Sequence, residues 1–443
     1  MGELEQTMNF QKTFLISVLG TNDYLACRYY HENAPDNLTE PVRFVQEAII
    51  YLMPETERNR LETFIYLTEE AKNKNWLNDG HGRQCEGLES RLARRNINST
   101  PVDIPIGKSE KEIWKIFQKI VDSIPESSRL IVDITHSFRS VSMILLAALR
   151  YAKTVKKVDV AAIYYGAMEA SGSIPILKKM KPAERKVPIF DMTPFDAILD
   201  WSEAASDFIY SGSAAKLRFL AEERIIPILK KTKGKDEQAK IIRKFVKNLD
   251  DFCSNISTNR GPSIQKESKI VEESLLKAKQ TNILEPLFPL FEQIEQEVRE
   301  FGGDSLDIAL QTAKWCLKHN FLPQGFTALQ EGLITWCLEK IGDSNVLEIG
   351  KREAVMSAFA IFNKKIPKEQ WNENAKNNIH IIEQIFELPN IKILAKSMDK
   401  LSNRRNNINH GGFNQDQIKP ETFKKDLDRL VKEISSWKKQ NNF

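Results

Sequence analysis

The strongest constraint on the fold is a series of short apolar runs that alternate with helix-like segments in the first part of the chain. Residues 14–19 (FLISVL) are mostly apolar and the run stops at Gly20. Similar runs cover 64–68, 129–135 and 158–165, with helix-like stretches at 41–53, 109–124 and 137–154. Strands that are apolar on both faces and separated by helices are typical of a mostly parallel sheet covered on each side. The sequence therefore predicts an α/β domain with a Rossmann-like sheet.

The pattern changes near residue 195. Strand-like runs fade beyond this point, and apolar residues recur at helical spacing, as in Ile198, Trp201, Ala205 and Phe208. The stretch 230–273 is rich in charged residues and contains an Arg-Gly-Pro sequence, which is typical of solvated helices and a loop. The expected fold class is thus α/β plus all-α, with a Rossmann-like part over 1–195, a helical connector over 196–280 and a helical domain over 281–443.

Composition narrows the class of protein. The chain has 443 residues, of which 41% are hydrophobic and 28% charged, as in ordinary globular proteins. A net charge of +4 neither requires nor excludes a nucleic-acid partner. The five cysteines form no CxxC pair, so neither a disulfide framework nor a zinc site is expected. The apolar runs fall far short of the ~20 residues that cross a bilayer, and the first residues do not resemble a signal peptide. We therefore expect a cytoplasmic protein with no membrane partner.

Polar residues follow the predicted strands at their carboxyl ends, which is where ligands bind in an open parallel sheet. Gly20 ends the first strand and allows a ligand to approach the backbone. After 129–135 the chain enters a helix, whose free N–H groups, together with Ser137 and Arg139, suit a phosphodiester anion. The expected ligand-binding residues are Gly20, Thr21, Asn22, Asp23, Thr135, His136, Ser137, Phe138, Arg139, Tyr165 and Gly166.

A plainer interpretation of these strand ends stays open. Thr135 or Ser137 would then cap a helix, and His136 and Arg139 would be exposed polar residues. Asp133, if buried in its strand, has to be paired, which favours a structural role for it. Neither 20–24 nor 133–139 contains the GxGxxG or GxxxxGK[ST] pattern, which argues against NAD and ATP as ligands.

The segment 403–412 (NRRNNINHGG) suggests chemistry on RNA. RNA is cut without a metal when its own 2′-OH attacks the adjacent phosphate, which requires proton transfer and stabilisation of negative charge. His410 precedes two glycines typical of a helix C-terminus, where carbonyl dipoles favour the imidazolium form. Arg405 would hold the phosphate, and Asn406, one turn before His410, would orient the histidine or the phosphate. The expected catalytic residues are Arg405, Asn406 and His410, and no metal is expected.

The ordinary alternative is that His410 only compensates a helix dipole and the arginine pair is surface charge. This motif supplies a single histidine per chain, whereas the reaction benefits from more than one proton-handling group. We therefore expect a homodimer, or a higher even oligomer, with a composite active site at the two-fold axis.

These motifs together resemble the CRISPR-associated ribonucleases that join a CARF sensor domain to a HEPN nuclease domain, and the resemblance covers nearly the whole chain. Residues 19–22 (LGTN), 133–140 (DITHSFRS) and 164–169 (YYGAME) resemble the ligand loops of the sensor. Arg405-Asn406, followed after three residues by His410, is similar to the HEPN pattern of Arg, four to six residues, and His. Arg404 offers an alternative start, so which arginine faces the phosphate stays open.

The resemblance implies a CARF domain over 1–195, a connector over 196–280 and a HEPN domain over 281–443. It implies that a cyclic oligoadenylate, with tetra-adenylate favoured over hexa-adenylate, is an allosteric activator made during type III CRISPR antiviral defence. The implied activity is metal-independent cleavage of single-stranded RNA without any cofactor. Slow degradation of the ligand by the sensor, through Thr135, His136 or Ser137, stays open.

A transcription regulator of a different class is the main alternative. It would combine the same ligand sensor with a DNA-binding helical domain. Such a domain requires a helix-turn-helix with a basic recognition helix, and the sequence contains no convincing one. Specific binding of duplex DNA, with RNA left uncut, would favour this alternative.

Overall fold

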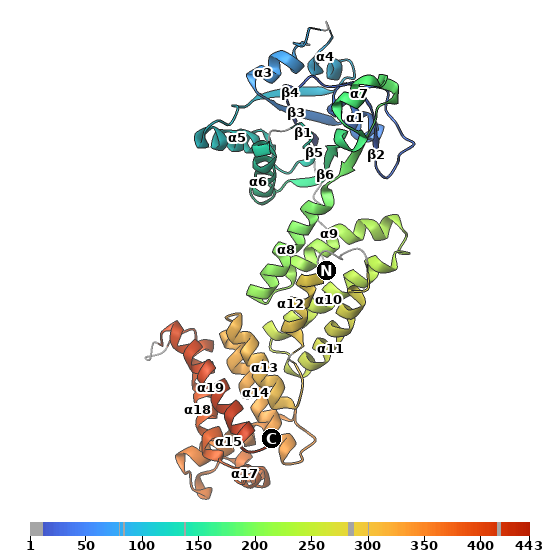
Figure 1. Ribbon diagram of the computed structural model, residues 1–443. Helices are drawn as coiled ribbons and strands as arrows, with labels where there is room; N and C mark the ends of the chain where they lie inside the picture. Colours follow the sequence, from blue (N-terminus) through green and yellow to red (C-terminus); the bar gives the residue numbers. More distant parts are fainter. Residues whose placement is uncertain are drawn as a thin grey trace. The chain divides into compact units, whose positions relative to one another are not determined.

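The computed structural model describes residues 12–78, 80–82, 85–136, 139–281, 288–299, 301–413 and 418–443. The chain divides into two compact units, residues 1–197 and 198–443 (Figure 1). The first unit is built on a sheet and the second on helices, as the sequence predicts. The assignment of sensor, connector and nuclease domains stays a prediction.

The first unit contains a seven-stranded sheet with the order β2-β7-β6-β5-β1-β3-β4. Its strands are β1 (Thr13–Leu19), β2 (Arg28–His31), β3 (Leu61–Leu67), β4 (Asn98–Asp103), β5 (Arg129–Asp133), β6 (Asp159–Gly166) and β7 (Lys186–Asp191). All neighbouring strands are parallel except β6 and β7, which pair antiparallel. The prediction of a mostly parallel sheet is confirmed.

Helices cover both faces of this sheet because its central strands are apolar on both sides. On β1, Leu15 and Leu19 belong to one buried cluster, whereas Phe14, Ile16 and Val18 belong to the other. The first cluster includes residues of α1 and α4, and the second includes residues of α5 and α6. The helices of this part are α1 (Val45–Leu52), α2 (Glu55–Arg58), α3 (Glu69–Ala71), α4 (Leu88–Ala93), α5 (Glu110–Ser123), α6 (Arg139–Lys156) and α7 (Ile174–Lys179). α8 (Thr193–Ser211) begins in the first unit and continues into the second.

Three strands, β2, β4 and β7, are not among those expected from the apolar runs. β2 has only four residues, and β2 and β4 form the two edges of the sheet. None of the six residues of β4 is buried, and it contains Pro101. β7 contains Pro188. Short, exposed or proline-containing strands lack the continuous apolar pattern of buried ones, so their sequences do not stand out.

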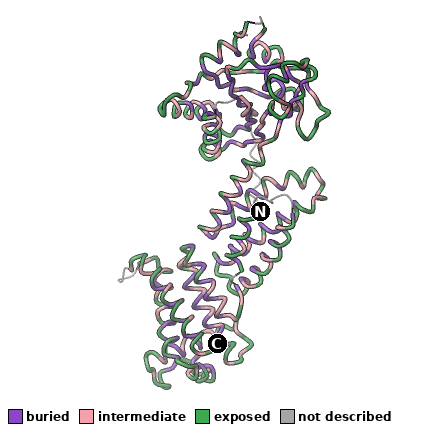
Figure 2. Tube along the Cα trace, in the orientation of Figure 1, coloured by how far each residue is buried: buried purple, intermediate pink, exposed green. Residues whose placement is uncertain are grey.

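The second unit consists of helices wherever the structure describes it. They are α9 (Ala215–Lys231), α10 (Glu237–Ser257), α11 (Gly261–Ala278), α12 (Phe288–Val298), α13 (Ser305–Lys318), α14 (Leu322–Lys340), α15 (Ile349–Lys364), α16 (Glu373–Asn377), α17 (Ile379–Phe386), α18 (Ile391–Asn409) and α19 (Pro420–Gln440). Figure 2 shows buried segments along the inner faces of these helices. Within the described ranges, each helix is too short or too polar to pass through a bilayer.

Two buried clusters form the core of the helical unit. One joins residues of α8 to α12, including Phe208, Phe245 and Phe252. The other joins residues of α13 to α19, including Trp336 and Trp437. α13 contributes to both clusters and α14 packs closely along it. This pair of helices therefore forms the centre of the unit and fixes the position of the α18 helix that follows.

Candidate functional site

The first candidate site lies at the point of the sheet where the strand order reverses. β1 pairs with β3 on one side and with β5 on the other, and all three strands are parallel. The carboxyl ends of β1, β5 and β6 therefore meet at one edge, where doubly wound sheets bind their ligands. Gly20 directly follows β1, Thr135 comes two residues after β5, and Gly166 is the last residue of β6. The structure thus brings these three predicted residues to the same edge.

The loop after β1 is held by Asn75, a fully buried residue in the π-helical turn Lys72–Trp76. Its Nδ2 donates hydrogen bonds to the carbonyl oxygens of Gly20 and Asn22, both at 2.9 Å. Its Oδ1 accepts a hydrogen bond of 3.1 Å from Nη2 of Arg43, which also lies 3.6 Å from Oδ1 of Asp23. Because Asn75 holds two carbonyl oxygens, the loop after β1 has a defined shape.

Gly20 is required at its position because Tyr24 and His136 crowd it. Its N–H donates to the Tyr24 hydroxyl at 3.0 Å, and the Tyr24 ring stacks on the His136 imidazole with centroids 4.1 Å apart. A Cβ atom on residue 20 would lie 2.6 Å from the Tyr24 hydroxyl oxygen. The first and second strand ends are therefore in direct contact.

His136 is half-buried, and burial lowers its pKa to about 4, so the imidazole is neutral at pH 7. Its Nε2 is buried and makes no hydrogen bond within the described part of the chain. A neutral imidazole can donate or accept a hydrogen bond, but it does not act as a cation.

Thr135 joins the second and third strand ends. Its Oγ1 accepts a hydrogen bond of 2.8 Å from the Gly166 N–H, and its own N–H donates to Oδ1 of Asp133 at 3.0 Å. Asp133 is fully buried and also accepts bonds from Ser17 Oγ at 2.6 Å and Gln46 Nε2 at 3.2 Å. Burial raises the pKa of Asp133, and the bonds from Ser17 and Thr135 oppose that shift. The prediction that a buried Asp133 is paired is confirmed.

The remaining predicted ligand-binding residues are placed less completely. Thr21 is half-buried, and Asn22 and Asp23 are exposed in the loop after β1. Tyr165 donates to the Glu169 carboxylate, and burial together with this partner raises the pKa of Tyr165 to about 12. Ser137 and Phe138 lie outside the described residues, as does the side chain of Arg139, the first residue of α6.

Sequence reasoning did not select Asn75, Arg43 or Tyr24 for this site. Asn75 and Arg43 lie far along the chain from the strand ends that they support, and no local pattern marks them. Tyr24 follows Asp23 in a segment already singled out. The position of this aromatic residue, directly after a polar strand end, could have been used to add Tyr24 to the predicted site.

The second candidate site lies at the end of α18. The helix ends at Asn409 with His410 as its C-cap, and Gly411 and Gly412 follow with φ values of 61° and 74°. The helix stop predicted at this position is confirmed. The His410 N–H donates to the Asn406 carbonyl oxygen at 2.9 Å, and both side chains are exposed. Arg405 is partly buried one turn earlier.

The two neighbouring arginines have different partners. Nε of Arg404 donates to Oδ2 of Asp426 on α19 at 2.7 Å, and Lys400 lies 2.6 Å from the other carboxylate oxygen. Burial favours a raised pKa for Asp426, but these two cations hold its pKa below the usual value. Arg404 is therefore engaged in joining α18 to α19. Nη1 of Arg405 instead donates to Oε1 of Glu331 on α14 at 2.8 Å, so only Arg405 faces α14.

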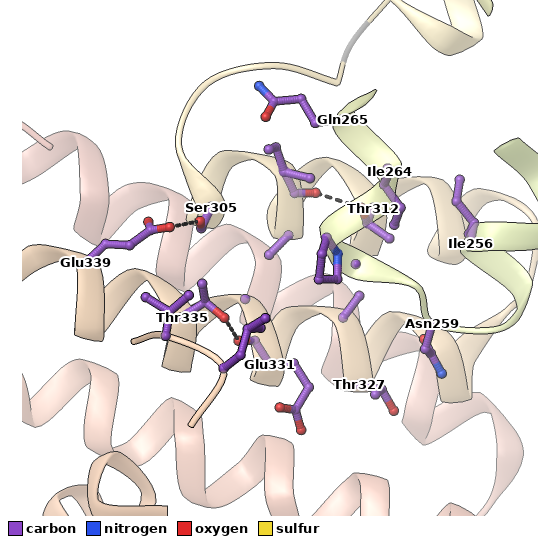
Figure 3. A pocket seen from close by; sticks show the side chains of 18 of the residues that line it. Ile256, Asn259, Ile264, Gln265, Ser305, Thr312, Thr327, Glu331, Thr335 and Glu339 are labelled. Carbon is purple, nitrogen blue, oxygen red and sulfur yellow. Dashed lines mark hydrogen bonds between the residues drawn. The ribbon is translucent and has the colours of Figure 1, made fainter. Parts of the chain in front are cut away.

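Glu331 also borders a cavity of about 500 Å³ in the helical unit (Figure 3). Its walls come from α13, α14 and the connection between α10 and α11, with Asn259 and Ile264 on one side and Thr335 on α14. The lining is largely apolar, and Ser305 on α13 donates to the Glu339 carboxylate at 2.6 Å. No sequence pattern distinguishes Glu331 from other surface glutamates, so it was not predicted.

Comparison with known proteins finds a distantly similar protein but no matching family. No protein-family profile matches the chain. The chain is 21% identical over 338 residues to CRISPR-associated protein MJ1674 of Methanocaldococcus jannaschii. The alignment covers 75% of this chain and 46% of that protein, so the chain spans about half the length of the curated relative it matches. This protein is therefore a distant relative of a CRISPR-associated protein.

Proposed function

We propose that this protein is a ribonuclease of type III CRISPR defence that cuts single-stranded RNA when a cyclic oligoadenylate binds to its first unit. The observation that carries the proposal is that Arg405 and His410 lie at a capped helix end, in the helical unit that follows a mostly parallel sheet with polar loops at its switch point. The distant similarity to a CRISPR-associated protein supports the same context.

The proposed cleavage uses the RNA's own 2′-OH as the nucleophile. Arg405 binds the scissile phosphate and stabilises the negative charge that develops on it. His410 donates a proton to the leaving 5′-oxygen, and the imidazole of the second copy in the proposed dimer takes up the proton that the 2′-OH loses. Asn406, exposed one turn before His410, contacts the phosphate or the imidazole. No metal or cofactor takes part.

The proposed activator site is the edge formed by Gly20, Thr135 and Gly166. Gly20 is buried and lets the Tyr24 and His136 rings pack closely, and the half-buried His136 ring is the one that would contact an adenine base. The positive end of the α6 helix dipole lies at Arg139, directly after the second strand end, and favours a phosphate there. Tetra-adenylate remains favoured over hexa-adenylate only by the family resemblance.

A homodimer, or a higher even oligomer, is the proposed assembly. The outer face of α6 carries a stripe of exposed apolar residues, namely Met143 (77% exposed), Leu146 (41%), Tyr151 (49%) and Val155 (53%). Such a stripe is unusual on a monomer surface and suits contact with a second copy. Because α6 begins at Arg139, a two-fold contact near this end of the helix would bring two ligand loops close together.

Signalling requires that the activator bind the cleavage-competent form more tightly than the idle form. α6 is tied to the first turn of α8 by the buried carboxylate of Asp196, which accepts a hydrogen bond from Lys153. α8 continues to Ser211 and contributes Trp201 and Phe208 to a core cluster of the helical unit. This helix is therefore the proposed transmitting element.

The proposal is tested by titrating cyclic tetra-adenylate and cyclic hexa-adenylate against a fluorescent RNA reporter in EDTA. We expect cleavage to appear only with one of these rings and to be unaffected by the chelator, because no metal takes part. A reporter that stays intact with every ring, together with specific binding of duplex DNA, would instead support a transcription regulator.

A further inference from the structure

Arg405 does not stand alone in the helical unit. It belongs to a cluster of three charged side chains, Arg352, Glu331 and Arg405, which we call the arginine clamp. They come from three helices, since Glu331 is on α14, Arg352 on α15 and Arg405 on α18. Oε1 of Glu331 accepts from Arg405 at 2.8 Å and Oε2 accepts from Arg352 at 2.7 Å. One carboxylate thus holds two guanidinium groups.

Arg352 fixes the carboxylate from the other side. Its Nη1 donates to Thr335 Oγ1 at 2.9 Å and to the Val346 carbonyl oxygen at 2.7 Å. Its Nη2 donates to the backbone carbonyl oxygen of Glu331 at 3.0 Å as well as to its carboxylate. Arg352 makes these four hydrogen bonds and its side chain is only 18% exposed, so it has few donors left for a substrate. Its role is to hold the Glu331 carboxylate in place.

Arg405 has most of its donors left. A guanidinium carries five N–H groups, and Glu331 accepts from Nη1 alone. Within the ranges that the structure describes, Nε and Nη2 of Arg405 make no hydrogen bond, and its side chain is 29% exposed. The contact with Glu331 therefore fixes the Nη1 side of the guanidinium. It leaves Nε and Nη2 available for a bidentate contact with a phosphate.

We propose that Glu331 is a positioning residue that orients Arg405 toward the scissile phosphate, with Arg352 neutralising its charge. The inference rests on the proposed ribonuclease function and assigns to the same site a residue that acts through Arg405. Pre-orientation matters because an arginine side chain otherwise samples many rotamers, and fixing the reacting geometry accounts for a large part of catalysis.

The net charge of the arginine clamp decides whether Glu331 positions Arg405 or prevents Arg405 from binding RNA. A lone glutamate beside Arg405 would cancel its charge and repel RNA. Here two arginines surround one glutamate, so the clamp keeps a net charge of +1. A phosphate approaching Arg405 therefore still meets a positive site. This balance favours a positioning role over a block on the active site.

The test replaces Glu331 by glutamine, which keeps the shape of the side chain and removes its charge. We expect kcat for RNA cleavage by the fully activated protein to fall by at least about tenfold, because Arg405 loses its fixed orientation. KM should stay the same or decrease, since a negative charge near the RNA is lost. Glu331→Asp, which keeps the carboxylate, should recover part of kcat. The melting temperature should change little because Glu331 is 43% exposed.

Glu339→Gln is the matched control. Glu339 lies two turns along the same helix, borders the same cavity and accepts a bond from Ser305 rather than from an arginine. This variant should cleave RNA like the wild type. An unchanged kcat in Glu331→Gln, or cleavage by that variant without activator, would overturn the positioning role. Failure of the proposed function itself is recognised separately, because the activated wild type would then leave the RNA intact, or Arg405→Ala would cleave as well as the wild type.

Discussion

His410→Ala is expected to lower RNA cleavage by the activated protein by about a thousandfold, and Arg405→Ala by a similar factor. In the proposed mechanism, loss of the imidazole removes the group that protonates the leaving 5′-oxygen. Loss of the guanidinium would leave the developing charge on the phosphate without its permanent cation. The measurement is kcat on a defined single-stranded RNA at saturating activator, together with the melting temperature and activator affinity of each variant.

Folding and activator binding should survive both substitutions. His410 is exposed at the helix end, and Arg405 pairs with a glutamate that is 43% exposed, so neither contributes much to stability. His380→Ala, an exposed histidine on α17, is the matched control and should cleave normally. Arg404→Ala should lower stability, because it leaves the buried Asp426 with fewer partners, yet keep cleavage. Retained cleavage in both His410→Ala and Arg405→Ala would contradict the assignment.

Asn75→Ala is expected to destabilise the first unit by about 3 kcal/mol. The substitution leaves the buried carbonyl oxygen of Gly20 and that of Asn22 without their shared donor, and it removes an acceptor from Arg43. Urea unfolding followed by fluorescence measures the loss. Because the loop after β1 is no longer fixed, half-maximal activation should also require more cyclic oligoadenylate.

Asn73→Ala is the control for this second prediction. Asn73 lies in the same π-helical turn, but its side chain is exposed. Its removal should leave both stability and the activator dose response close to those of the wild type. If Asn75→Ala lost stability but kept the wild-type dose response, the loop after β1 would not belong to the activator site.

The sheet could be predicted from the sequence wherever a strand is buried on both faces. β1 and β5 have continuous apolar sequences because each packs against helices on both sides. The edge strands β2 and β4 and the proline-containing β7 could not be found in this way, since exposure or a short length removes the apolar pattern. The antiparallel pairing of β7 with β6 follows from chain direction, which local sequence does not encode.

Residues at the candidate sites could be predicted where their neighbours in the sequence mark the end of a helix or strand. The glycine pair after His410 marks the end of α18, and Gly20 marks the end of β1. Residues that act from a distance were not predictable. Asn75 supports Gly20 across 55 positions, and Glu331 holds Arg405 across 74, so their contacts exist only after the chain has folded. Neither has a sequence neighbour that shares its role.

The central claim is most directly tested with a DNA strand that contains a single ribonucleotide, incubated in EDTA with the protein and its cyclic oligoadenylate activator. We expect one cut, directly 3′ of the ribose, because the only available 2′-OH attacks its own phosphate. One product should carry a 2′,3′-cyclic phosphate and the other a 5′-hydroxyl. Cuts at deoxyribose positions, products with 3′-hydroxyl and 5′-phosphate ends, or an identical cut by His410→Ala would contradict it.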